Sequence, residues 1–287
     1  MNRTRRRTRT VLLGAVAALA LVAAACVPEP APANTTWEFK ATKVTVNDVQ
    51  DEVCVIVCVN RADEPYVMNI ATRVKIGVPN SASGFVVSSR SNNPEGLEAG
   101  ESATLSGAAG APVSFPGISR LDVADLLNQD NKLEVFVVYT WVMEEDTVAV
   151  NTAANDVKDL LVDALNSTLA QGSLPSDASA LLDLIFDNLG NAFTLLLSNI
   201  PLFGLGDDVG GGALNVGIAA KGGLADVVDA SIGTADIPEF NVPVVSLPPD
   251  VKHVNIFTMK NTTTFTGQSF DQYGDGEHTY DFQANQG

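Results

Sequence analysis

The chain has 287 residues, with 17 Lys and Arg against 34 Asp and Glu, which gives a formal net charge of −17. Five arginines lie within residues 2–10, so the remainder holds 12 basic against 34 acidic residues, a net charge near −22. A surface this acidic repels phosphate backbones, which argues against nucleic acid as a partner. It is equally unfavourable for docking on anionic lipid headgroups.

Residues 1–25 have the three parts of a cleavable secretion signal. The five arginines form a basic head without any acid, and an apolar run of 15 residues follows from Val11 to Ala25. This run is shorter than the roughly 20 residues needed to cross a bilayer, and it ends in three alanines. The sequence therefore predicts export, by either the general or the twin-arginine route.

Cys26 directly follows these alanines. The segment from Val22 to Cys26, Val-Ala-Ala-Ala-Cys, resembles the lipobox of bacterial lipoproteins, with Ala23 at a position where that family prefers Leu. The resemblance implies that Cys26 becomes the diacylated N-terminus and that its lipid is the contact with the membrane. Alternating prolines make residues 26–36 an extended tether. The alternative is that Cys26 remains an ordinary thiol.

The rest of the chain predicts an α+β fold, a mainly antiparallel, immunoglobulin-like β-sandwich with an inserted apolar helical hairpin. Residues 37–150 form its first part, as short strands separated by Gly, Pro and Asn turns. Leu133 to Met143 is the strongest strand of this part and is expected at the centre of a sheet. Residues 204–287 form a Gly-rich segment, expected to be a linker or an irregular strand, followed by further strands.

Between these parts, residues 151–203 change to a helical period. Polar residues recur every three or four positions, whereas the other positions are mostly Leu, Ile, Phe, Val or Ala. The row expected to face outward is Asp159, Asp163, Asn166 and, at the same spacing, Ala170 in the first helix, and Asp183, Asp187, Asn191, Thr194 and Ser198 in the second. The wide apolar faces either pack on each other and on the sheet, or meet lipid, an apolar ligand or another subunit.

Cys54 and Cys58 are the remaining cysteines. On one straight strand their Cα atoms would be roughly 13 Å apart, whereas a disulfide needs about 4.4–6.8 Å. A straight strand and an internal disulfide therefore exclude each other. Export favours a small disulfide-closed loop, and two buried free thiols are the alternative.

The acidic residues and the histidines suggest two further chemistries, calcium binding and hydrolysis. Asp48, Asp51, Asp63 and Glu64 are hard oxygen ligands on loops that could meet at one end of the sandwich, a pattern suited to calcium. The alternative for these four is solvated turn acids. The only histidines are His253 and His278, and either could serve a hydrolase only if the fold brought a Ser and an Asp to it.

The sequence thus predicts an exported, lipid-anchored protein at the outer face of the cell membrane or in the envelope. A binding or assembly role is expected, with the hairpin as a surface for self-association or for a protein partner. The alternatives are a carrier of lipid or another apolar ligand, and a secreted hydrolase.

Overall fold

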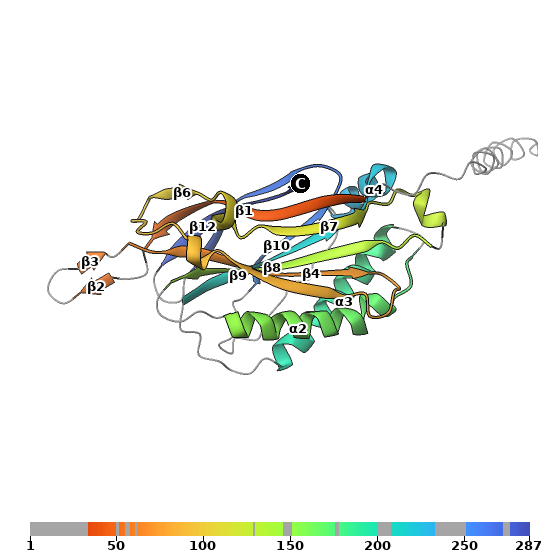
Figure 1. The fold of residues 1–287 in the computed structure, drawn as a ribbon, viewed down its shortest axis with the longest axis horizontal. Coiled ribbons are helices and arrows are strands. Elements are labelled where there is room, and N and C mark those ends of the chain that lie inside the picture. Colours follow the sequence, from red (N-terminus) through yellow and green to blue (C-terminus); the bar gives the residue numbers. More distant parts are fainter. Residues whose placement is uncertain are drawn as a thin grey trace, which may run out of the picture. The chain divides into compact units, whose positions relative to one another are not determined.

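The computed structural model describes ten stretches of the chain, all within one compact unit that runs from Ala33 to Gly287. These stretches are residues 34–49, 52–54, 58–60, 62–128, 130–145, 151–175, 178–199, 208–232, 251–271 and 276–287. They are mostly β, with two five-stranded sheets, a two-stranded ribbon and three α-helices (Figure 1). The predicted signal and most of the predicted tether lie outside the described residues.

Sheet 1 is entirely antiparallel and is built around strand β1. Its strand order is β11-β12-β1-β6, and β7 also pairs with β1. The buried positions of β1 first alternate through Trp37, Phe39 and Ala41, and then through Val44 and Val46. The alternation changes phase at a register irregularity between Ala41 and Lys43, because an extra residue shifts which side chains face the core. The strands are β1 (Asn34–Asp48), β6 (Ser102–Thr104), β7 (Val113–Ser119), β11 (Thr263–Asp271) and β12 (Glu277–Gln286).

Sheet 2 has the strand order β10-β9-β8-β4-β5 and is antiparallel except for the parallel pair β9 and β10. All residues of β8 are buried, as predicted for its sequence, because one face meets sheet 1 and the other meets the helices. The ribbon of β2 (Glu52–Cys54) and β3 (Cys58–Asn60) is a separate sheet. The strands of sheet 2 are β4 (Pro65–Lys75), β5 (Ser83–Ser88), β8 (Glu134–Glu144), β9 (Asp208–Ile218) and β10 (Val251–Thr258).

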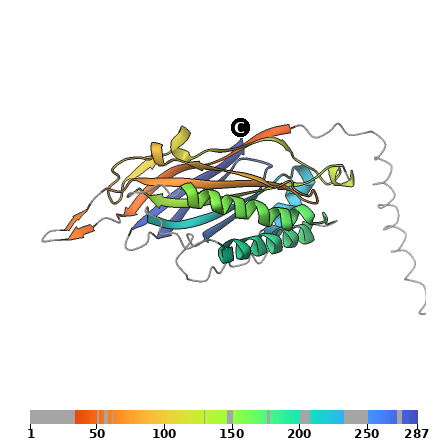
Figure 2. The same ribbon diagram turned by 60° about the horizontal axis from the view of Figure 1, so that its bottom comes forward.

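Three helices cover the face of sheet 2 that points away from sheet 1 (Figures 1 and 2). They are α2 (Asn151–Ser167), α3 (Ala178–Asn199) and α4 (Gly222–Ile232), and four short 3-10 helices lie in connections at Arg90–Asn92, Gly107–Gly110, Asp125–Leu127 and Leu169–Gln171. Buried leucines and isoleucines of α2 and α3, such as Leu161 and Ile185, share one core with β4, β8 and β9. Asp183 and Asp187 face outward, and the opposite, apolar side of α3 packs on sheet 2.

Three details differ from the sequence-based expectations. Ala170 does not belong to the outward polar row, because α2 ends at Ser167 and Ala170 is buried. The Gly-rich segment contains a full central strand, β9, in which Gly212 stands opposite Trp141. Large aromatic side chains can compensate for a glycine in a neighbouring strand. Helix α4 was not predicted, and it joins β9 to β10 as a parallel crossover that an all-antiparallel fold lacks.

Candidate functional site

A buried acid–base pair is the most chemically distinctive feature of the described residues. His278 Nε2 lies 2.8 Å from Asp63 Oδ2, and the two side chains are 0% and 1% exposed. Glu144 and Tyr280 are also buried, and both carboxylates act electrostatically on the Tyr280 hydroxyl. We call these four residues the acid–base cluster.

Segments distant in sequence bring the cluster together. Asp63 precedes β4 and is held by two main-chain hydrogen bonds with Leu97, at 2.9 and 3.0 Å. His278 is the second residue of β12 and pairs with Val46 of β1. Glu144 ends β8 opposite Pro65, and its Oε1 accepts a hydrogen bond from the Glu64 amide at 3.4 Å. Sheet 1 therefore supplies the imidazole, the segment that precedes β4 supplies the Asp63 carboxylate, and the end of β8 supplies the Glu144 carboxylate.

A carboxylate bound to one imidazole nitrogen orients the ring, as it does in a hydrolase triad. A hydrolase also needs a nucleophile at the ring and a path for substrate. His278 and Asp63 are closed off from solvent in this structure, and their contact joins β12 of sheet 1 to the segment that precedes β4. The hydrolase hypothesis stays a prediction.

The Tyr280 hydroxyl is buried and has no hydrogen-bond partner among the described residues. Burial, followed by the charges of Asp63 and Glu144, raises the pKa of Tyr280 far above its ordinary value of 10.0. Above pH 10 the unfolded chain therefore releases a proton that the folded chain keeps. The contribution of Tyr280 to stability is complete below pH 10 and is lost as the pH rises beyond it.

We expect Tyr280→Phe to leave stability at pH 7 unchanged or to raise it by about 1 kcal/mol, because it removes a buried unpaired hydroxyl. The variant should lose less stability than the wild type between pH 9 and pH 11. Urea unfolding at each pH, followed by circular dichroism, measures both effects. Parallel alkaline losses in the two proteins would contradict the assignment.

Of the four residues predicted as calcium ligands, the three that the structure describes, Asp48, Asp63 and Glu64, do not form a metal-binding group. Asp63 is engaged with His278, Asp48 is exposed at the end of β1, and Asp51 lies outside the described residues. In the part of the chain that the structure describes, no group of three His, Cys, Asp or Glu side chains is arranged to hold a metal ion. With Asp51 undescribed, calcium binding stays a prediction.

The other predicted site residues are the three cysteines and His253. The backbones of Cys54 and Cys58 face each other across β2 and β3, and Cys26 lies outside the described residues. His253 is on β10, where its Nε2 lies 2.8 Å from the Ser269 carbonyl oxygen and its ring meets Phe270 edge-on. As for His278, a catalytic role of His253 stays a prediction.

A row of buried amides crosses the space between the sheets and was not predicted. The Thr140 hydroxyl donates to Asn69 Oδ1 at 2.7 Å, and Asn215 Nδ2 donates to Thr140 Oγ1 at 3.2 Å. Asn255 Nδ2 donates to Asn215 Oδ1 at 2.7 Å and to Gln268 Oε1 at 3.1 Å, and Gln268 Nε2 returns a bond to Asn255 Oδ1. This amide row links β4, β8, β9 and β10 of sheet 2 to β11 of sheet 1.

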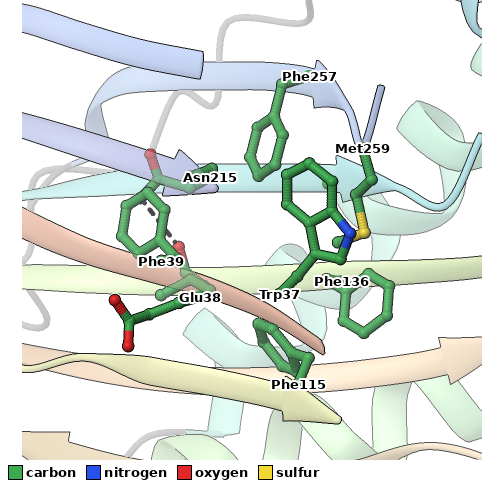
Figure 3. Close-up of a pocket in the computed structure, with 11 residues that line it drawn as sticks. Trp37, Glu38, Phe39, Phe115, Phe136, Asn215, Phe257 and Met259 are labelled. Carbon is green, nitrogen blue, oxygen red and sulfur yellow. Dashed lines mark hydrogen bonds between the residues drawn. The ribbon is translucent and has the colours of Figure 1, made fainter. Parts of the chain in front are cut away.

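A small aromatic cavity lies beside the amide row (Figure 3). The side chains of Trp37, Phe136, Phe257 and Met259 surround it, and Gly217 leaves room for the Phe257 ring, which would lie 3.0 Å from a β-carbon there. Its volume is about 10 Å³. That is at the lower limit for one water molecule, so an acyl chain does not fit this cavity. The cavity lends no support to the hypothesis of a lipid carrier.

Comparison of the chain with protein-family models, with curated proteins and with solved structures finds no match. Within the described residues, none of the helices combines the length and the apolar character needed to span a membrane.

Proposed function

We propose that the protein is exported and held at the outer face of the cell membrane by a lipid on Cys26, where it serves in binding or assembly. The observation that carries the proposal is the order of features in the first 33 residues. A basic head, an apolar run and three alanines lead directly to Cys26, and a Pro-rich spacer follows. Together, these features match what a chain that is exported and then lipid-anchored requires.

The way in which the spacer would enter the fold supports this proposal. Strand β1 begins at Asn34, so seven residues separate it from Cys26. An extended spacer of this length reaches roughly 22 Å at about 3.1 Å per residue. Strand β1 pairs with β12 on one side and with β6 and β7 on the other. A tether attached at the start of β1 would transmit force to a strand that is paired with neighbouring strands along both of its edges.

The finer description of the fold is also a proposal. We propose an immunoglobulin-like sandwich with residues 151–203 inserted as a hairpin, although the parallel β9 and β10 pair departs from that fold. The described apolar side of α2 and α3 is occupied by sheet 2. Self-association through the hairpin would therefore use its outward side or residues beyond those described. Light scattering of the mature protein at several concentrations tests it.

The lipid anchor is tested with an alkyne fatty acid fed to cells that express the full chain. We expect the wild type to incorporate the label and to remain in the membrane fraction. Cys26→Ser should lose the label completely and move to the soluble exported fraction, whereas Cys54→Ser should keep it. An unlabelled wild type whose N-terminal peptide starts at Cys26 without acyl chains would overturn the anchor and leave export intact.

A further inference from the structure

The backbone register of the β2 and β3 ribbon places the two remaining cysteines opposite each other. Glu52 pairs with Asn60, Val53 with Val59, and Cys54 with Cys58, in antiparallel register. The two cysteines therefore lie on two paired strands and do not share one straight strand, on which their Cα atoms would be roughly 13 Å apart.

Directly opposite residues of an antiparallel pair have Cα atoms about 4.5 or 5.5 Å apart, depending on the hydrogen-bonding pattern. Both separations fall within the range of about 4.4–6.8 Å that a disulfide spans. The register thus meets the geometric requirement in either pattern. Of the two alternatives left open by the sequence, it favours the disulfide-closed loop.

The ribbon also needs a constraint beyond its hydrogen bonds. It consists of three cross-strand pairs and belongs to neither large sheet. An isolated two-stranded hairpin is only marginally stable in water. At its base, the chain re-enters the fold at Asp63, which is fixed by His278 and Leu97. A covalent bond at the Cys54 and Cys58 pair would hold the opposite end.

We propose that Cys54 and Cys58 form an intramolecular disulfide that staples the tip of the ribbon. In forming it, the two thiols lose two protons and two electrons and create one S–S bond. The electrons reduce the disulfide of a thiol–disulfide oxidoreductase, or glutathione disulfide, to two thiols. The oxidising compartment in which this happens rests on the proposed export of the protein.

One tryptic peptide reports on the pair. Cleavage after Lys43 and Arg61 releases residues 44–61, which contain Cys54 and Cys58 but not Cys26. Protein from the exported fraction is treated with N-ethylmaleimide under denaturing conditions, without reductant, and then digested. We expect the peptide without maleimide, lighter than the dithiol by two hydrogens. After reduction it should carry two maleimide groups. Cys54→Ser should leave Cys58 open to one maleimide without reduction.

Two maleimide groups on the unreduced peptide, or a link from it to Cys26 or to a second chain, would overturn the disulfide. A second arm exposes the reduced, purified chain to glutathione disulfide. Pairing is expected there wherever the protein resides in the cell, and failure to pair contradicts the register argument. Loss of the lipid anchor is instead detected in the N-terminal peptide that begins at Cys26. Failure of the proposed anchor and failure of the proposed disulfide are therefore distinguishable.

Discussion

His278→Ala is expected to lower the free energy of unfolding by about 3–5 kcal/mol. The substitution removes the imidazole from a carboxylate that is 1% exposed, and removing one member of a buried, hydrogen-bonded acid–base pair is costly. Small domains are commonly stable by only about 5–15 kcal/mol, so the loss is large relative to the total. Urea unfolding of the mature chain, followed by tryptophan fluorescence, measures it.

The second histidine of the chain provides the matched control. His253 makes one hydrogen-bond contact with the Ser269 carbonyl, meets Phe270 edge-on and is half-buried, so His253→Ala should change stability by no more than about 1 kcal/mol. The double variant Asp63→Leu/His278→Leu should regain part of the loss, because it removes both members of the pair. Equal losses of unfolding free energy in His278→Ala and His253→Ala would contradict a distinct contribution of the Asp63 and His278 pair to stability.

Asn215→Leu is expected to cost about 2–4 kcal/mol. Asn215 occupies the middle of the amide row, where it donates to the Val138 carbonyl and to Thr140 and accepts from Asn255. Its loss leaves buried polar partners without their bonds, at about 1–3 kcal/mol for each. Thermal and urea unfolding measure the change.

The control for Asn215 lies in the same sheet. Thr72 is buried and donates a single bond to the Val137 carbonyl, so Thr72→Val should cost only about 1 kcal/mol. A double-mutant cycle of Asn215→Leu with Asn255→Leu should give a coupling energy above about 0.5 kcal/mol, because the two amides bond directly. Additive effects would contradict a continuous row.

Periodicity along the chain was enough to predict several elements. The run of mostly β-branched and aromatic residues from Leu133 to Met143 predicted a central strand, and β8 is the middle strand of sheet 2. The spacing of Asp159, Asp163, Asp183 and Asp187 predicted which side of each helix faces outward. These signals are local, because each side chain's direction follows from the helical or extended backbone.

Elements whose signal depends on distant residues were missed. The backbone amide of Leu224, near the start of α4, donates a hydrogen bond to Asp122 Oδ1 at 3.3 Å. The two residues are about a hundred positions apart in the chain. Strand β9 is rich in glycine, which is unfavourable in strands, and it is stabilised by its neighbours β8 and β10. The irregularity after Ala41 obscured the alternation of β1, because a one-residue shift reverses the faces.

By itself the sequence determined the acidic charge, the helical and extended periods and the outward faces of α2 and α3, and it predicts the export signal and the Cys26 anchor. Only the tertiary structure decided which faces meet. Asp63 and His278 were assigned to separate hypotheses, calcium and hydrolysis, yet they form one buried pair across 215 positions. The physical reason is that a local pattern specifies which side of an element is buried, whereas its partner is specified by contacts between segments far apart in the chain.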